Sequence, residues 1–162
     1  DEFTICIGLS YKHVPYMGVI AIPCKNEIYY SLKGKGSFSL IDGKVSKIHV
    51  NNKVNDLTVL DSRFFFTKEE RLIIDKHSDV IKHEFVVGST IKACYIASGK
   101  AELSYRMSDG TKEWDIAASV LLIKEAGGVF LKPDLTPYKF NREDVYNHEG
   151  YIMANRKENI LL

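Results

Sequence analysis

The spacing of apolar residues changes once along the chain, near residues 51–56, and this change constrains the fold more than any other feature. Before it, short β-branched and aromatic runs occupy residues 3–9, 17–23, 27–32, 37–41 and 46–50. The turns between these runs are assigned to Pro15, Lys25-Asn26, Gly34-Lys35-Gly36 and Asp42-Gly43. Short extended runs separated by turn residues predict an antiparallel meander, with a tight hairpin at Asp42-Gly43.

After residue 56, short apolar runs alternate with helical patterns. The predicted strands are 57–61, 84–87, 101–105, 129–132 and 151–154, and the predicted helices are 68–76, 90–98 and 114–126, followed by a short C-terminal helix. This alternation is typical of an α/β layer with mainly parallel strands. The predicted fold class is therefore mixed α/β: antiparallel strands in residues 1–54, followed by a layered α/β domain in residues 55–162.

Composition excludes several classes of function. The 22 basic and 21 acidic residues give a net charge of +1, so no overall field attracts a nucleic acid polymer or an anionic membrane. The apolar runs are too short to span a bilayer, and the first residues lack the basic start of a signal peptide. Three cysteines without a C-x-x-C pair indicate reduced thiols, not a zinc site. We therefore expect a soluble, cytoplasmic protein.

The meander has no helix within its own sequence. A sheet in a soluble domain normally has at least one covered face, and unpaired edges recruit partners. We therefore expect residues 3–50 to expose a face or an edge that polypeptide N-terminal to them covers. Alone, the chain is expected to self-associate as a possible homo-oligomer.

The strongest local motif is Trp114-Asp115-Ile116-Ala117-Ala118, followed by Glu125-Ala126-Gly127-Gly128. Asp115 is placed to open a helix, small alanines allow close backbone approach, and Gly127 is placed to end the helix. Judged by residue type alone, Asp115 is an ordinary helix-capping aspartate.

A second motif is Gly88-Ser89-Thr90-Ile91-Lys92, at a predicted strand-to-helix turn. The unpaired N–H groups at such a turn can hold an anion. A glycine followed by a hydroxyl residue is also a common helix cap. Judged by residue type alone, Lys92 is a solvated helix-face lysine and Arg106 a surface arginine at a strand end.

The motif W-D-x-A-A followed by E-A-G-G resembles the C-terminal signature of the inositol monophosphatase superfamily. Residues 111–115, T-K-E-W-D, and 137–144, P-Y-K-F-N-R-E-D, are similar to the forms in its 3'(2'),5'-bisphosphate nucleotidases of the CysQ type. The resemblance runs from residue 2 to 154. It implies the sugar-phosphatase fold, in which the meander belongs to the sheet of an N-terminal domain.

The resemblance also implies roles for individual residues. Asp115 would be the catalytic residue that binds Mg2+, and the substrate-binding residues would be Ser62, Gly88, Ser89, Thr90, Lys92, Arg106 and Asp115. Two fixed cations suit a substrate with a second phosphate. Ser62 stands where the nucleotidases carry S-R-S-H, but Phe65 holds the histidine position.

The function implied is that of a magnesium-dependent phosphoric monoester hydrolase that removes the 3'-phosphate of adenosine 3',5'-bisphosphate. The family's main metal motif, D-P-x-D-G-T, is matched only in its last three letters by Asp109-Gly110-Thr111, with Arg106 where a carboxylate is required. We expect a missing N-terminal half to supply most of the Mg2+ site and the chain alone to be inactive. The alternatives are an inositol or sugar monophosphatase, a non-catalytic partner half, and a module that binds another anion.

Overall fold

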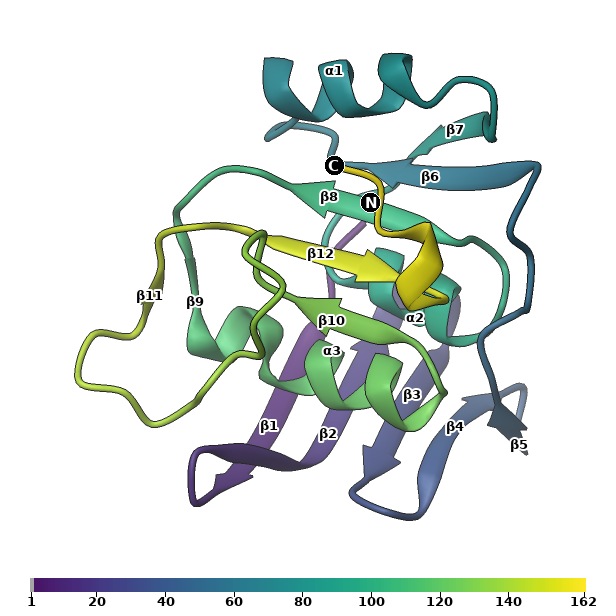
Figure 1. The fold of residues 1–162 in the computed structure, drawn as a ribbon. Coiled ribbons are helices and arrows are strands. Elements are labelled where there is room, and N and C mark those ends of the chain that lie inside the picture. The colour runs from purple at the N-terminus through teal and green to yellow at the C-terminus, as the bar shows by residue number, and fades with distance from the viewer. Residues whose placement is uncertain (1) are drawn as a thin grey trace.

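The computed structural model describes residues 2–162, which form two five-stranded sheets, a two-stranded sheet of β9 and β11, and three α-helices (Figure 1). The strands are β1 (Ile5–Tyr11), β2 (Val14–Ile22), β3 (Glu27–Leu32), β4 (Gly36–Ile41), β5 (Lys44–Ile48), β6 (Leu57–Asp61), β7 (Ile81–Val86), β8 (Leu103–Arg106), β9 (Thr111–Lys112), β10 (Val129–Leu131), β11 (Tyr146–Asn147) and β12 (Tyr151–Ala154). The helices are α1 (Lys68–Lys76), α2 (Ile91–Ala97) and α3 (Glu113–Glu125), with short 3-10 helices at Pro23–Lys25 and Lys157–Asn159. The predicted mixed α/β class is confirmed.

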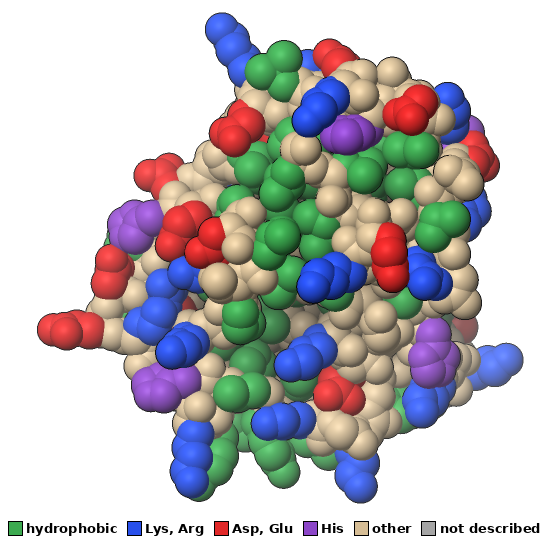
Figure 2. Space-filling model, in the orientation of Figure 1, with side chains coloured by type: hydrophobic (Ala, Val, Ile, Leu, Met, Phe, Trp, Pro, Cys, Tyr) green, Lys and Arg blue, Asp and Glu red, His purple; other side chains and the backbone are tan. Residues whose placement is uncertain are grey.

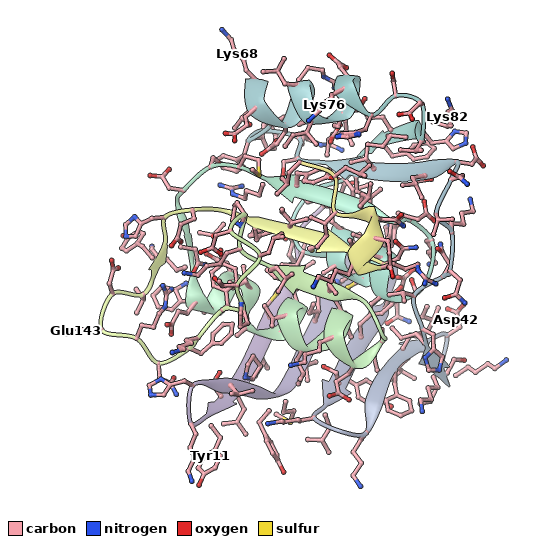
Figure 3. The ribbon with its side chains drawn as sticks, in the orientation of Figure 1. Tyr11, Asp42, Lys68, Lys76, Lys82 and Glu143 are labelled. Atoms are coloured by element: carbon pink, nitrogen blue, oxygen red, sulfur yellow. The ribbon has the colours of Figure 1, made fainter. Side chains whose placement is uncertain are left out.

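The first sheet is the predicted antiparallel meander, in the order β1-β2-β3-β4-β5. The hairpin at Asp42-Gly43 is confirmed, because both residues have positive φ and Asp42 lies at the β4–β5 turn in Figure 3. The assignment of the first turn to Pro15 is wrong, since Pro15 lies inside β2 opposite Ser10. A register shift beside Ser10 accommodates the proline, which has no N–H to give to the ladder.

Helix α3, from much later in the chain, covers one face of this sheet (Figure 1). The contact is close because small residues meet in it. A Cβ atom added to Gly8 would lie 2.8 Å from the Ala117 Cβ, and one added to Gly18 would lie 2.9 Å from the Ala118 Cα. Helix α3 therefore covers one face of the meander, and the expected exposed face is the opposite one.

The opposite face of the first sheet is apolar and open. Cross-strand partners share a face, so the register defines its members. They are Ile5, Ile7, Leu9, Met17, Val19, Ala21, Ile28, Tyr30, Leu32, Phe38, Leu40 and Val45. Several side chains on this outer face are more than half exposed, among them Ile7 at 57%. A contiguous apolar surface of this kind marks an interaction face.

We expect the chain alone to self-associate through this outer face. Replacing Ile7 and Val19, which are paired across β1 and β2, by aspartate should give a monomer, because a stacked interface does not tolerate two buried charges. Light scattering at high concentration measures the change. The control is Leu72→Asp, a similarly exposed leucine on α1. A wild-type chain that stays monomeric would contradict the expectation.

The second sheet has the order β10-β12-β8-β6-β7. Strands β7, β6, β8 and β10 run in the same direction, as the alternating pattern predicts, whereas β12 runs antiparallel to its neighbours β8 and β10. The reason is the long connection before β12, which carries no crossover helix and returns the chain in the opposite direction. The predicted terminal helix is only the 3-10 turn Lys157–Asn159.

Two apolar cores fix these layers. The larger lies between the two sheets and includes Ile20, Leu60, Ile91 and Leu122, which brings α2 and α3 between them. The smaller packs α1 and the C-terminal segment against the other side of the second sheet. Figure 2 shows basic and acidic side chains interspersed over one face of the molecule. No helix within residues 2–162 has the length and hydropathy needed to cross a membrane.

Candidate functional site

A cavity of about 920 Å³ lies beyond the carboxyl ends of β6, β7 and β8, beside the start of α3. Ligands of open α/β sheets commonly bind beyond the carboxyl ends of parallel strands, in pockets of about 300–1,000 Å³. Every residue that the sequence assigns to the site lines this cavity: Ser62, Gly88, Ser89, Thr90, Lys92, Arg106 and Asp115. The structure thus brings the predicted site together, while the role of each residue stays a prediction.

The turn between β7 and α2 is held by the segment before β1. The hydroxyl oxygens of Ser89 and Thr90 lie 2.7 and 2.6 Å from the Thr4 hydroxyl. Ser89 has a φ of +55°, a conformation that non-glycine residues adopt only when their surroundings hold them there. The N–H of Gly88 donates to the Glu2 carboxylate at 2.8 Å. In the turn expected to bind an anion, the Gly88 N–H is therefore already bonded to the Glu2 carboxylate.

Lys92 is not a solvated helix-face lysine. Its side chain is buried, and Nζ donates to the carbonyl oxygens of Val87 at 3.0 Å and Ser89 at 3.2 Å. An ammonium group has three donor hydrogens, so one remains for a ligand. Burial, assisted by the charge of Arg106, lowers the pKa of Lys92 to about 8. Lys92 therefore anchors the turn and also supplies positive charge to the cavity.

Arg106 forms a second cationic wall. Only 8% of it is exposed, and its guanidinium lies 4.6 Å from the centroid of the Phe65 ring, where a cation is attracted to the ring face. Nη2 donates to the Asp109 carbonyl oxygen at 3.2 Å, and Nε has no hydrogen-bond partner in the described part of the chain. A buried donor without a partner is rare, so the guanidinium is suited to hold an anion.

Asp115 lies on the first turn of α3 and is exposed. It is not the capping residue itself, because the helix starts at Glu113. Instead its Oδ2 reaches back and accepts a hydrogen bond from the Lys112 N–H at 2.7 Å. Its other oxygen has no hydrogen bond within residues 2–162. Asp115 therefore keeps one oxygen available for a cation.

Residues 2–162 fit only part of a magnesium site. Mg2+ requires six oxygen ligands in near-octahedral geometry. Among the described residues, no group of three His, Cys, Asp or Glu side chains could hold a metal ion. Asp115 fits as a single ligand, and the remaining ligands have to come from water, substrate or other polypeptide.

Sequence reasoning missed the aromatic rim of the cavity. Phe64 is 82% exposed and lines the cavity beside Phe65 and Phe66. Three consecutive phenylalanines in a predicted turn are the signal that could have found it, because turns are normally polar. Asp109 and Gly110 lie in a loop as predicted, whereas Thr111 begins β9, and all three residues line the cavity.

Asp61, next to Ser62, carries a buried carboxyl group. Burial, followed by the neighbouring Glu84 carboxylate, raises the pKa of Asp61 to about 8. An aspartate in an unfolded chain has a pKa of about 3.9. Between pH 4 and 8 the folded chain therefore holds a proton that the unfolded chain has lost, and stability falls as pH rises through this window.

We expect the free energy of unfolding to fall by up to about 1.4 kcal/mol per pH unit between pH 5 and 8 because of Asp61. Asp61→Asn should remove most of this slope and raise the stability at pH 8. Urea denaturation at pH 5 and 8 measures both values. Asp75→Asn, an exposed change on α1, is the control. If the free energy of unfolding has the same pH slope in wild type and in Asp61→Asn, the slope does not come from Asp61.

Comparisons with known proteins identify the family of the chain. Residues 1–161 match the inositol monophosphatase family. The chain is 28% identical over 157 residues to the 3'(2'),5'-bisphosphate nucleotidase CysQ of Aggregatibacter actinomycetemcomitans, covering 94% of this chain and 57% of that protein. It is also 28% identical over 163 residues to inositol monophosphatase 2 of Solanum lycopersicum, covering 93% of this chain and 60% of the relative.

A solved structure shows the same fold. The crystal structure of CysQ from Bacteroides thetaiotaomicron superposes with a TM-score of 0.83 and 28% identity, covering 96% of this chain and 64% of that one. The chain thus spans less than two thirds of the length of these relatives. The family match extends over nearly all of the sequence, and the chain belongs to the inositol monophosphatase family, a family of phosphatases.

Proposed function

We propose that the chain is the substrate-binding part of a magnesium-dependent phosphatase that removes the 3'-phosphate of adenosine 3',5'-bisphosphate. The observation that carries the proposal is the pairing of two buried cations, Lys92 and Arg106, in the same cavity as Asp115. A substrate with one phosphate needs one anion-binding group besides the metal site, whereas a bisphosphate can use both cations. The similarity to CysQ proteins supports the same substrate class.

Each residue has a defined task in this proposal. Asp115 holds one metal ion through its free carboxylate oxygen, while Arg106 and Lys92 bind the phosphate that is not cleaved. Ser62, Ser89 and Thr90 add hydroxyl donors, and the turn at Gly88 lets the backbone approach the ligand. When bound, Mg2+ activates water and neutralises charge on the leaving oxygen.

The remaining ligands are proposed to come from polypeptide that covers the outer face of the first sheet. The relatives exceed this chain in length, because it spans 57% and 60% of two of them. An additional segment that packs on the apolar outer face, next to β1, would lie beside the cavity, since Thr4 just before β1 contacts Ser89. The cytoplasmic location expected from the cysteines belongs to the same proposal.

An inositol or sugar monophosphatase is the second candidate. The similarity to a tomato inositol monophosphatase and the phenylalanine at the expected histidine position both favour it. A non-catalytic partner half is the third. Phosphate release by the chain together with an N-terminal portion that contains D-P-x-D-G-T decides among them: faster turnover of the bisphosphate supports a nucleotidase, faster turnover of inositol phosphate supports the second candidate, and no turnover supports the third.

The chain by itself should be inactive and should bind Mg2+ weakly. Within residues 2–162, Asp115 is the carboxylate that the family resemblance assigns to the metal, and one carboxylate competes poorly with water for Mg2+. Calorimetric titration is expected to show no site tighter than about millimolar, the weak end for divalent ions in protein sites. Release of phosphate from adenosine 3',5'-bisphosphate by the purified chain would overturn this expectation.

A further inference from the structure

Glu113, the first residue of α3, is hydrogen-bonded to a loop at residues 141–145 that is distant in the sequence. Its carboxylate accepts hydrogen bonds from the Asn141 N–H at 2.8 Å, from the Arg142 N–H at 3.0 Å and from Arg142 Nε at 2.8 Å. The backbone N–H of Glu113 donates to the Val145 carbonyl oxygen at 2.9 Å. Glu113 is only 8% exposed, so these four bonds form a buried junction.

The junction continues through a buried amide toward β9. Nη2 of Arg142 donates to Oδ1 of Asn147 at 2.8 Å, and Nδ2 of Asn147 donates to the Thr111 hydroxyl at 3.1 Å. Asn147 is fully buried. Strand β11 also pairs with β9, with Tyr146 opposite Lys112 (Figure 1). The loop is therefore tied to both residues of β9.

Strand β9 in turn carries the group that orients Asp115. The Lys112 N–H donates to Oδ2 of Asp115 at 2.7 Å. The position of Lys112 thus determines where the free oxygen of Asp115 lies. In contrast, Glu143, labelled in Figure 3, lies on the same loop but makes no hydrogen bond to any described residue. The path from the half-buried Arg142 runs through the buried Asn147 to the Thr111 hydroxyl, continues along the backbone to Lys112, and ends at the exposed Asp115 carboxylate.

The junction is held by charge. Nε of Arg142 lies 2.8 Å from Oε1 of Glu113, and the backbone N–H groups of Asn141 and Arg142 donate to the same carboxylate. Glu113 and Arg142 therefore form an ion pair with several additional donors. Removing one member leaves the other charged and poorly solvated, which costs more than the loss of an exposed pair.

We propose that Glu113 and Arg142 form a clamp that positions the Asp115 carboxylate for metal binding. Glu113 lies in T-K-E-W-D and Arg142 lies in P-Y-K-F-N-R-E-D, the two segments that resemble the nucleotidase forms. The hydrogen bonds between Glu113 and Arg142 join these two segments directly. The proposal rests on the proposed function, because it assumes that Asp115 binds a metal.

The first experiment measures amide hydrogen exchange in the 162-residue chain. In Glu113→Ala and in Arg142→Ala, exchange of the Lys112 amide should become about 10- to 150-fold faster, the range expected for hydrogen bonds to charged groups. The Leu122 amide, farther along α3, should keep its rate. Arg142→Lys keeps the positive charge but loses the planar guanidinium with its several N–H donors. The exchange rate of the Lys112 amide should therefore rise less in this variant than in Arg142→Ala. An unchanged Lys112 rate in folded variants would overturn the clamp.

Glu149→Gln is the matched control. It breaks the ion pair between Glu149 and Lys132, which joins two segments near the same loop but does not contact Glu113. Lys112 exchange should be unchanged in this variant. Equal acceleration in Glu149→Gln and Glu113→Ala would mean that any weakening of this region loosens β9, and the clamp would lose its specific role.

The second experiment uses the chain together with the upstream metal motif. Glu113→Ala should raise the Mg2+ concentration needed for half-maximal activity by about 10-fold or more, with the KM for substrate nearly constant and excess Mg2+ restoring the rate. A raised KM with an unchanged Mg2+ requirement would refute the positioning role. If Asp115→Asn retains full activity, the proposed function itself fails, whereas the exchange experiment judges the clamp independently of catalysis.

Discussion

Asp115→Asn is expected to lower kcat by at least about 100-fold on every phosphate monoester, in an enzyme that combines this chain with the upstream metal motif. Asparagine keeps the size of the side chain and an oxygen that can still accept from the Lys112 N–H. The change therefore removes the charge at the metal and leaves the helix start intact. Because the loss concerns the metal, excess Mg2+ should restore only part of the rate.

The measurement is kcat for adenosine 3',5'-bisphosphate and for inositol 1-phosphate at several Mg2+ concentrations. Asp109→Asn is the control, because Asp109 also lines the cavity but lies on a loop that does not match the family's metal motif. It should change kcat little. Wild-type rates in Asp115→Asn would leave Asp115 with a structural role alone, as the acceptor of the Lys112 N–H at the start of α3.

Most of the fold could be predicted because local patterns agree with the final structure. The strand at Leu57–Asp61 and the helix at Lys68–Lys76 have the predicted bounds. The errors occur where contacts between segments far apart in the sequence determine the local structure. Pro15 reads as a turn residue, yet it lies in β2 because the neighbouring register shift tolerates its missing N–H. Strands β9 and β11 were missed, since a two-residue pair has no periodicity to detect.

The candidate site could also be predicted only in part. The family motifs select residues that prove to line one cavity, but local sequence does not reveal the contacts that hold them. Lys92 has the pattern of an exposed helix residue, whereas it is buried beneath the turn that it anchors. The positive φ of Ser89 and the contact of Glu2 with Gly88 depend on segments more than 80 residues apart, at separations of 85 and 86 residues. Such pairings arise from tertiary packing, which single-sequence patterns do not encode.

The arrangement of the two cations leads to a selective prediction. Arg106→Gln and Lys92→Met should each reduce kcat/KM for adenosine 3',5'-bisphosphate by about 10- to 150-fold, the range for a hydrogen bond to a charged group. Turnover of inositol 1-phosphate should change little, because this substrate lacks the second phosphate. Methionine retains the apolar stem of the buried lysine, and the hydroxyl bond of Ser89 to Thr4 keeps a second anchor on the turn.

The pH dependence separates the lysine from the arginine. Lys92 has a pKa of about 8, so in the free enzyme it loses its proton, and with it its charge, as pH rises through 8. kcat/KM reports groups in the free enzyme, so the value for the bisphosphate should fall above pH 8 in wild type. In Arg106→Gln the decline should begin at a higher pH, because the Arg106 charge that helps to lower the pKa of Lys92 is gone. In Lys92→Met this decline should be absent, because no titrating charge remains. The measurement is kcat/KM from pH 6 to 9.5 for both substrates. Equal losses on both substrates in the two variants would refute the nucleotidase assignment, and a decline that persists in Lys92→Met would assign the titration to another group.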